Sequence, residues 1–296
     1  MNIFMTGSRG LIGTALASRL QAAGHSLTRL VRKPSNSPNE RYWDSQAARH
    51  DPRLLDGCDV LVHLAGESIA SSRWTEQQKK RIYDSRIVST RALSETMLHM
   101  EQPPRAFIVA SAIGYYGDVG ETLLTEQSPP GKNFLAHVCR DWEQAADPVR
   151  DNIRVVHVRT GMVLSEQGGG LAAMLLPFKL GIGGVVGNGK QYWSWIALTD
   201  IARLFQFAVE TERMAGPVNG TAPHPVTCRE FTKRLGKRLH RPTFFPLPAF
   251  AARLTLGEMA DELILASTRA VPEAAQAAGF QFEFPDLRPA LDALPL

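Results

Sequence analysis

Short apolar runs alternate with amphipathic segments through the first half of the chain. Residues 2–6 form an apolar run, and residues 11–23 then carry apolar side chains at helical spacing before Gly24 supplies a stop. The same alternation predicts strands over 26–31, 59–64, 106–110 and 154–158, and helices from 76 to about 100 and around 138–146. Repeated strand-helix-strand order favours an α/β fold, a Rossmann-like doubly wound parallel sheet.

Beyond Arg159 the pattern changes to glycine- and proline-rich stretches, and helices are indicated again only after Thr199 and Thr227. We therefore expect a Rossmann domain over residues 1–165. Residues 166–296 should form mainly a smaller C-terminal lobe, with some segments returning to the Rossmann domain.

The composition fits a folded globular protein, with 44% hydrophobic and 21% charged residues among 296. The net charge is only +4 and the basic residues are scattered, so we expect neither a nucleic-acid partner nor a membrane partner. Three widely separated cysteines indicate reduced thiols, and the chain opens on a strand pattern without a leader. These features predict a cytoplasmic location.

A glycine-rich motif stands between the first predicted strand and the first predicted helix. Its glycines follow a GxxGxxG spacing: Gly7 permits a tight turn, Gly10 lets the backbone approach a pyrophosphate, and Gly13 allows close helix packing. Backbone N–H groups at the helix start attract phosphates, and the flanking strand and helix disfavour a purely structural turn. The expected cofactor-binding residues of this loop are Gly7, Ser8, Arg9, Gly10, Leu11, Ile12 and Gly13.

The end of the second predicted strand favours NADP over NAD. An acidic residue there selects NAD, whereas this chain has Arg32 followed by Lys33. A guanidinium binds a 2′-phosphate through forked, charge-assisted hydrogen bonds, and Arg9 is a second candidate for this contact. The alternative is that Arg32 and Lys33 form only a solvated turn.

Several motifs together carry a family resemblance. With TGxxGxxG at 6–13, HLAG at 63–66 and Tyr116-Gly117, the chain resembles the extended short-chain dehydrogenase/reductase superfamily. Further motifs resemble its atypical branch, often labelled epimerase family or nucleoside-diphosphate-sugar epimerase: GESI at 66–69, RWT at 73–75, GYYGD at 114–118, RTG at 159–161 and Trp195-Ile196.

The resemblance implies roles for residues outside the glycine loop. Further cofactor contacts are expected from Leu64, Ala65, Gly66, Arg86 and Arg159, although a surface ion pair is an equal alternative for Arg86. A small-molecule substrate, such as a nucleotide-linked one, is expected at Lys190, Gln191, Trp193 and Trp195. The alternative for these four is a β-loop with buried tryptophans. The long helix from residue 76 suits either a homodimer contact or packing on the sheet.

The superfamily's catalytic groups are missing. Its Tyr and Lys positions fall on Leu135 and Cys139, and Ala112 takes the place of its Ser or Thr. Neither Leu135 nor Cys139 can supply a proton donor tuned by a fixed positive charge. The candidate substitutes are the hydroxyls of Ser111, Tyr115 and Tyr116, with packing as the alternative for the tyrosines.

Two function classes follow from these observations. One is an NADP-binding epimerase or oxidoreductase that acts on a sugar nucleotide or a small carbonyl or hydroxyl compound with non-standard catalytic residues. The other is a catalytically inactive NADP-binding sensor or partner-binding protein. The eight histidines show no compact ligand pattern, so no metal site is expected.

Overall fold

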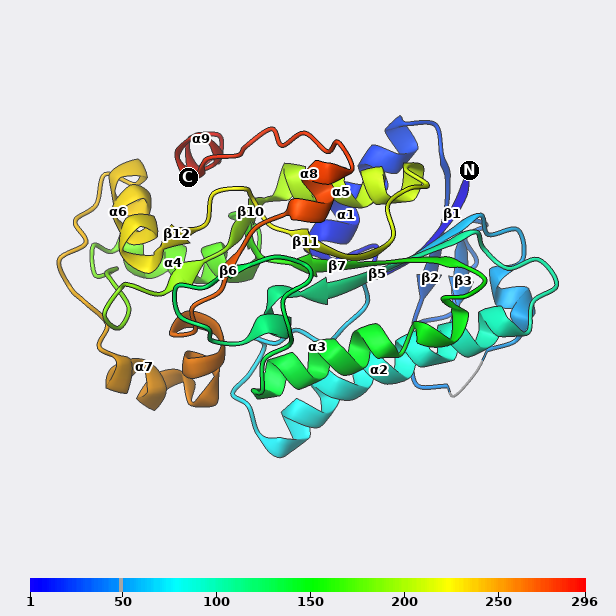
Figure 1. The fold of residues 1–296 in the computed structure, drawn as a ribbon, viewed down its shortest axis with the longest axis horizontal. Helices are drawn as coiled ribbons and strands as arrows, with labels where there is room; N and C mark the ends of the chain where they lie inside the picture. The colour runs from blue at the N-terminus through cyan, green and yellow to red at the C-terminus, as the bar shows by residue number, and fades with distance from the viewer. Residues whose placement is uncertain (48–49) are drawn as a thin grey trace. The chain divides into compact units, whose positions relative to one another are not determined.

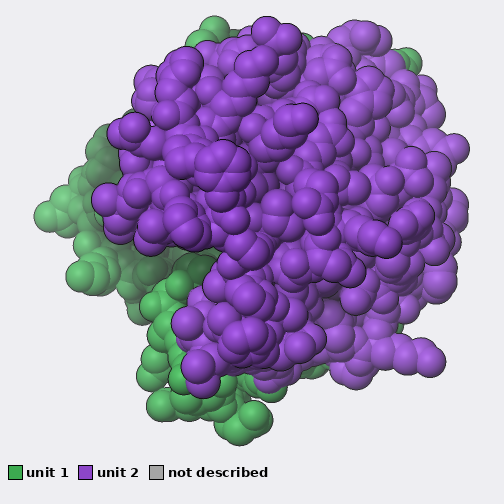
Figure 2. Space-filling view, turned by 90° about the vertical axis from the view of Figure 1, so that its left-hand side faces the viewer, with its two compact units in different colours: residues 1–111, 138–158, 202–218 green, residues 112–137, 159–201, 219–296 purple. Residues whose placement is uncertain are grey.

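The computed structural model describes residues 1–47 and 50–296, and they form two compact units. Unit 1 comprises residues 1–111, 138–158 and 202–218, and unit 2 comprises residues 112–137, 159–201 and 219–296 (Figure 2). The chain thus passes between the two units several times. The units are therefore more interleaved along the sequence than the predicted division at residue 165.

The described residues contain short strands and helices in the order shown in Figure 1. The strands are β1 Asn2–Thr6, β2 Ser26–Val31, β3 Glu40–Tyr42, β4 Val60–His63, β5 Ala106–Ala112, β6 Leu123–Leu124, β7 Arg154–Thr160, β8 Met162–Leu164, β9 Tyr192–Trp193, β10 Trp195–Ala197, β11 Gly216–Gly220, β12 Val226–Thr227 and β13 Arg269–Ala270. The α-helices are α1 Leu11–Ala22, α2 Glu76–Leu98, α3 Phe134–Gln144, α4 Gly169–Lys179, α5 Leu198–Glu210, α6 Cys228–Arg238, α7 Ala249–Leu256, α8 Glu273–Ala277 and α9 Leu287–Asp292.

A seven-stranded sheet forms the centre of unit 1 within the described ranges, in the order β11-β7-β5-β4-β1-β2-β3. Each pair of neighbouring strands in the part of this order that runs from β5 to β3 is parallel. From β1 the chain continues to β2 and β3 on one side and to β4 and β5 on the other, so the strand order reverses between β1 and β4. This confirms the predicted α/β Rossmann-like fold, in which ligands bind beyond the carboxyl ends of strands at such a reversal.

Helix α2 shows how local sequence fixes one boundary. The Gln78 backbone N–H donates to the Thr75 hydroxyl at 3.2 Å, which satisfies an otherwise unpaired donor in the first helical turn. Behind this cap, Ile82, Ile87 and Leu93 are buried. The apolar residues of α2 therefore contribute to the core of unit 1.

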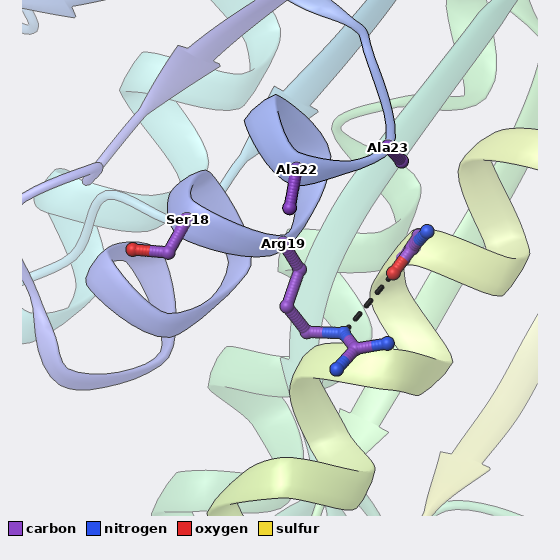
Figure 3. Close-up of a pocket in the computed structure, with 5 residues that line it drawn as sticks. Ser18, Arg19, Ala22 and Ala23 are labelled. Atoms are coloured by element: carbon purple, nitrogen blue, oxygen red, sulfur yellow. Dashed lines mark hydrogen bonds between the residues drawn. The ribbon is translucent and has the colours of Figure 1, made fainter.

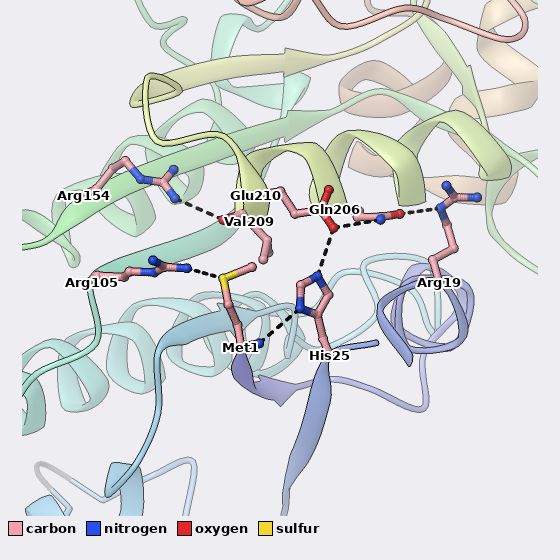
Figure 4. Close-up of polar contacts among 8 residues, drawn as sticks. All are labelled: Met1, Arg19, His25, Arg105, Arg154, Gln206, Val209 and Glu210. Carbon is pink, nitrogen blue, oxygen red and sulfur yellow. Dashed lines mark hydrogen bonds and ion pairs between the residues drawn. The ribbon is translucent and has the colours of Figure 1, made fainter. Parts of the chain in front are cut away.

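Polar contacts join the start of the chain to the end of α5 inside unit 1 (Figure 4). The His25 Nε2 atom lies 3.0 Å from a Glu210 carboxylate oxygen, and the Arg154 guanidinium donates to the Ala208 carbonyl at 2.9 Å. His25 immediately precedes β2 and Arg154 begins β7, while Ala208 and Glu210 lie at the end of α5. These contacts therefore stabilise the fold at the amino ends of the two strands, away from the carboxyl edge.

Unit 2 has its own apolar core, which includes Trp193, Trp195, Phe231 and Leu171. Small two-stranded pairings, such as β8 with β10 and β9 with β12, connect its loops. Within the residues covered by the structure, no helix is long and apolar enough to cross a membrane.

Candidate functional site

The glycine turn between β1 and α1 is tightly packed at two of its three glycines. Gly7 has φ of +66°, and a Cβ atom there would lie 2.6 Å from the Leu64 carbonyl carbon. A Cβ on Gly13 would lie 2.1 Å from the Gly7 oxygen. At Gly10 the added atom would approach only the Gly7 oxygen, at 3.3 Å, with open space otherwise. The turn is therefore open at Gly10, where a ligand can approach the backbone.

A buried hydrogen-bond network holds the strand ends beside this turn. The Thr6 hydroxyl lies 2.7 Å from His63 Nδ1 and accepts the backbone N–H groups of Leu64 and Ala65 at 3.1 and 3.2 Å. Since Ser89 donates its hydroxyl to the Ser85 carbonyl at 2.7 Å, Ser89 Oγ accepts from His63 Nε2 at 3.1 Å, and Thr6 donates to Nδ1. The network fixes the 64–65 backbone against Gly7.

His63 is neutral in this arrangement, because each of its ring nitrogens has one assigned role. Complete burial, together with the positive charge of Arg86, lowers the pKa of His63 to about 3. The sequence motif contains His63, but its spacing alone does not reveal Thr6 and Ser89 as partners.

Arg86 on α2 lies next to the loop that follows β4. Its guanidinium carbon is 3.3 Å from the position of a Cβ on Gly66, and it stacks 5.1 Å from the Trp142 ring centroid. One guanidinium nitrogen donates to the Ile82 carbonyl at 3.0 Å. Burial lowers the pKa of Arg86, although its ordinary value is so high that it stays charged. This geometry favours the inward orientation over the surface ion pair.

The two arginines expected near a 2′-phosphate differ in their surroundings. Arg32 follows the last residue of β2 and is exposed. Arg9 pairs with Glu40 on β3 at 2.8 Å. Hydrogen bonds from Ser35 and Arg9 lower the pKa of Glu40. A pocket of about 350 Å³ next to the glycine turn is lined by Ser8, Arg9, Thr14, Ala17, Ser18, Arg29 and Glu40.

Another pocket of about 380 Å³ lies at the opposite end of α1 (Figure 3). It is lined by Arg19, Ala22 and Gln206, among others, and Arg19 donates to the Gln206 side chain at 3.0 Å. Because Ala22 ends α1 while the glycine turn begins it, this pocket is remote from the carboxyl edge of the sheet. We assign it no role in cofactor binding.

Ser111 and Glu143 form a polar pair inside unit 1 near the end of β5. The Ser111 hydroxyl donates to a Glu143 carboxylate oxygen at 2.8 Å. In the sheet, Thr6 of β1 pairs with His63 of β4, and His63 pairs with Val109 of β5. Ser111 lies two residues beyond Val109 in the direction of the carboxyl edge, just as Ala65 lies two residues beyond His63. The sequence indicates Ser111 as a candidate hydroxyl, but it gives Glu143 no chemical role, because only the fold brings the two side chains together.

The positions expected for the superfamily's Tyr and Lys are both buried. Leu135 is 6% exposed and Cys139 is 3% exposed. At the beginning of α3, the Glu262 carboxylate accepts the backbone N–H groups of Phe134 and Leu135 at 3.0 Å each. Helix α3 therefore begins at Phe134, four residues before its predicted start, and buries these two positions.

Tyr115, Tyr116 and Arg159 form a cluster inside unit 2. The Tyr116 hydroxyl donates to Asn219 at 2.7 Å and accepts from Arg159 at 3.0 Å, and the Arg159 guanidinium lies 3.5 Å from the Tyr115 ring centroid. Tyr116 is fully buried, and burial raises its pKa to about 12. These contacts favour packing over proton transfer for Tyr116, and they occupy the Arg159 side chain that we expected at the cofactor.

The residues expected to contact substrate separate into exposed and buried side chains. Lys190 is exposed, whereas Trp195 is 0% exposed and its indole N–H donates to the His224 carbonyl at 3.2 Å. Gln191 and Trp193 are buried, and both donate to the Ile264 carbonyl. The burial of these three favours the alternative of a loop with core tryptophans over stacking on a substrate. No group of side chains suited to a metal ion occurs in the described part of the chain.

The parallel sheet with its reversed strand order and the glycine turn at that reversal define an α/β protein with a Rossmann-like, dinucleotide-binding type of fold. The chain belongs to the NAD dependent epimerase/dehydratase family, whose model matches residues 3–219. A second match, to a domain of unknown function (DUF1731), covers residues 247–294.

Named relatives match over nearly the whole chain. Epimerase family protein Mb2239 of Mycobacterium bovis is 42% identical, covering 95% of this chain and 93% of the relative. Human epimerase family protein SDR39U1 is 37% identical, with 98% of each chain covered. A crystal structure of human SDR39U1 (isoform2) with NADPH has a TM-score of 0.91 at 36% identity, covering 99% of this chain and 98% of that one.

Proposed function

We propose that the chain binds NADP and uses it in hydride transfer on a polar hydroxyl or carbonyl compound, with a sugar nucleotide as the leading substrate class. The observation that carries the proposal is the glycine turn. Gly7 and Gly13 are held against backbone, while Gly10 leaves room for a ligand at the start of α1. The human relative solved with NADPH supports the same cofactor class.

The residues around the turn fit a dinucleotide. Backbone N–H groups at the start of α1 suit a pyrophosphate, and the fixed backbone of Leu64 to Gly66 offers a neighbouring surface. Arg86 adds a positive charge beside Gly66. Exposed Arg32 at the end of β2 is available to a 2′-phosphate and favours NADP over NAD.

Bound NADP would accept or supply the hydride, so the protein's own groups must handle the proton. Ser111 and Glu143 suit this task because their hydrogen bond connects a hydroxyl near the strand ends to a carboxylate. In alcohol oxidation the substrate hydroxyl gives its proton to Ser111 Oγ as the Ser111 proton moves to Glu143. In carbonyl reduction the two transfers run in reverse.

The sequence indicated three hydroxyls as candidate proton donors, and the proposed role of Ser111 makes it the first choice among them. Tyr116 has a raised pKa and a hydroxyl held between Asn219 and Arg159, so proton donation at neutral pH is unfavourable. Tyr115 stacks against Arg159 and is retained as the alternative donor. The exposed Lys190 is retained as a contact for a charged substrate.

The test is NADPH oxidation with a panel of sugar nucleotides and small carbonyl compounds. Glu143→Gln keeps an oxygen that accepts the Ser111 hydrogen bond but cannot take up a proton. It should lower kcat by about 100-fold or more while the Kd for NADPH stays within about twofold. The matched control is Glu212→Gln, since the Glu212 side chain is 87% exposed in unit 1.

An unchanged kcat in Glu143→Gln, with loss of activity in Tyr115→Phe instead, would reject the Ser111–Glu143 assignment. The burial of Leu135 and Cys139 favours a second candidate function, an NADP-binding protein without turnover. Tight NADPH binding with no oxidation across the panel would support that second function and reject the enzyme.

A further inference from the structure

Glu40 places a carboxylate beside the glycine turn, inside unit 1. It is the first residue of β3, and its carboxylate accepts a hydrogen bond from the Arg9 guanidinium at 2.8 Å. The Glu40 side chain is only 12% exposed, whereas the Arg9 side chain is 76% exposed. The fold therefore fixes the carboxylate, and Arg9 is the member of the pair that has room to change its contact.

The fold surrounds the Glu40 carboxylate with donors. In the sheet, Glu40 pairs with Arg29 of β2, and both residues line the pocket of about 350 Å³ beside the turn. Ser35 donates a hydrogen bond to the carboxylate, and the positive charges of Arg9 and Arg29 act on it. Two guanidinium groups and a hydroxyl suit a phosphate as well as a carboxylate. Glu40 thus occupies a site whose donors also suit a phosphate group of a ligand.

The Arg9–Glu40 pair lies before the strand end that Arg32 marks. Glu40 pairs with Arg29, two residues before Val31, which ends β2, and exposed Arg32 follows Val31. A 2′-phosphate is expected at that strand end. Arg9 therefore has two alternative anionic partners, the Glu40 carboxylate within unit 1 and the 2′-phosphate of a bound NADP.

The two partners compete because both are negatively charged. A phosphate monoester carries a charge of about −1.5 to −2 at neutral pH, so it attracts a guanidinium more strongly than a single carboxylate does, and it repels the carboxylate. An exposed ion pair contributes little free energy in water, so Arg9 loses little when it leaves Glu40. NADH has no 2′-phosphate and offers Arg9 no such partner.

We propose that Glu40 is a counterion of Arg9 that the 2′-phosphate displaces when NADP binds. The inference rests on the NADP binding proposed above and adds to it a residue that opposes the cofactor. Arg32 and Arg9 attract the 2′-phosphate, whereas Glu40 weakens its binding and leaves NADH binding unaffected. Glu40 therefore sets how strongly the chain prefers NADPH over NADH, and it does so from β3 rather than from the end of β2.

Fluorescence titration of wild type and Glu40→Gln with NADPH and NADH tests the proposal. Glu40→Gln keeps an oxygen that accepts a hydrogen bond from Arg9 but removes the negative charge. It should lower the Kd for NADPH by about three- to tenfold and change the Kd for NADH by less than about twofold. The matched control is Glu212→Gln, which removes a carboxylate from an exposed ion pair with Arg105 in unit 1 and should leave both Kd values unchanged.

A double-mutant cycle separates the displacement from general charge repulsion. Arg9→Gln alone should weaken NADPH binding, because the 2′-phosphate loses a partner. If Glu40 acts through Arg9, adding Glu40→Gln to Arg9→Gln should tighten NADPH binding less than Glu40→Gln does alone. The same gain in both backgrounds would overturn the displacement and leave only repulsion between Glu40 and the cofactor.

Circular dichroism and thermal unfolding of each variant check that the chain remains folded. An unchanged or higher Kd for NADPH in Glu40→Gln would overturn the proposal, because Glu40 would then be indifferent to the 2′-phosphate or needed to orient Arg9. An equal gain for NADH would also overturn it, since NADH has no 2′-phosphate. A wild type that binds neither cofactor would refute the NADP binding itself, and this inference with it.

Discussion

His63 gives a direct prediction because its burial links folding to pH. The imidazole has no exposed surface, and its pKa falls from an ordinary 6.5 to about 3 in the folded chain. Below pH 6.5 the unfolded chain binds a proton at His63 that the folded chain excludes until the pH approaches 3. The stabilisation from neutral His63 is therefore complete above pH 6.5 and is lost progressively as the pH falls.

The size of this effect follows from the two pKa values. Relative to neutral pH, the free energy of unfolding should lose about 1.4 kcal/mol at pH 5.5 and about 2.7 kcal/mol at pH 4.5 through His63 alone. Urea unfolding of wild type and His63→Asn at pH 7.5, 5.5 and 4.5 isolates this contribution. The variant should be less stable at pH 7.5 by about 1–3 kcal/mol, because its shorter amide cannot hold both hydroxyl partners.

The difference in stability between the two proteins should then shrink as the pH falls. The exposed His137, substituted as His137→Asn, is the control and should leave the pH dependence close to that of wild type. Parallel pH profiles for wild type and His63→Asn would refute the assignment of His63 as a buried neutral residue in the Thr6–Ser89 network.

Two substitutions in the glycine turn should have opposite consequences. Gly13→Ala places a methyl group within 2.1 Å of the Gly7 oxygen. In urea unfolding, this variant should have a free energy of unfolding lower than that of the wild type by about 1–3 kcal/mol or more. An undiminished free energy of unfolding would contradict the close packing at Gly13. Gly10→Val should abolish NADPH binding in a fluorescence titration while circular dichroism remains that of a folded protein, and normal NADPH affinity would show that the pyrophosphate does not approach Gly10.

The fold was predictable because its signals are local. The first strand, the glycine turn and α1 lie in consecutive residues, and the expected helix over 11–23 ends at Ala22 in the structure. The cap at Thr75 also follows from residues three positions apart. The three-residue strand β3 was not predicted, because so short a segment has no recognisable period and depends on pairing with β2.

The site was less predictable because its contacts join distant residues. Ser111 meets Glu143 across 32 positions, and Tyr116 meets Asn219 across 103 positions. The sequence indicates hydroxyls near the strand end, but only the fold shows which one has a carboxylate partner. The tryptophans of the 190–195 segment show the same difficulty. From the sequence, an aromatic pair in a polar loop could either stack on a ligand or pack in the core, and the structure places Trp195 in the core.

The central claim is that the carboxyl edge of the sheet binds NADP, selected by Arg32. Equilibrium titration of wild type and Arg32→Glu with NADPH and NADH, followed by cofactor fluorescence, tests it most directly. Wild type should bind NADPH more tightly than NADH, and Arg32→Glu should lose about 1.5–3 kcal/mol of NADPH binding free energy while NADH binding changes little. Equal affinity of the wild type for the two cofactors, or binding of neither, would contradict the account.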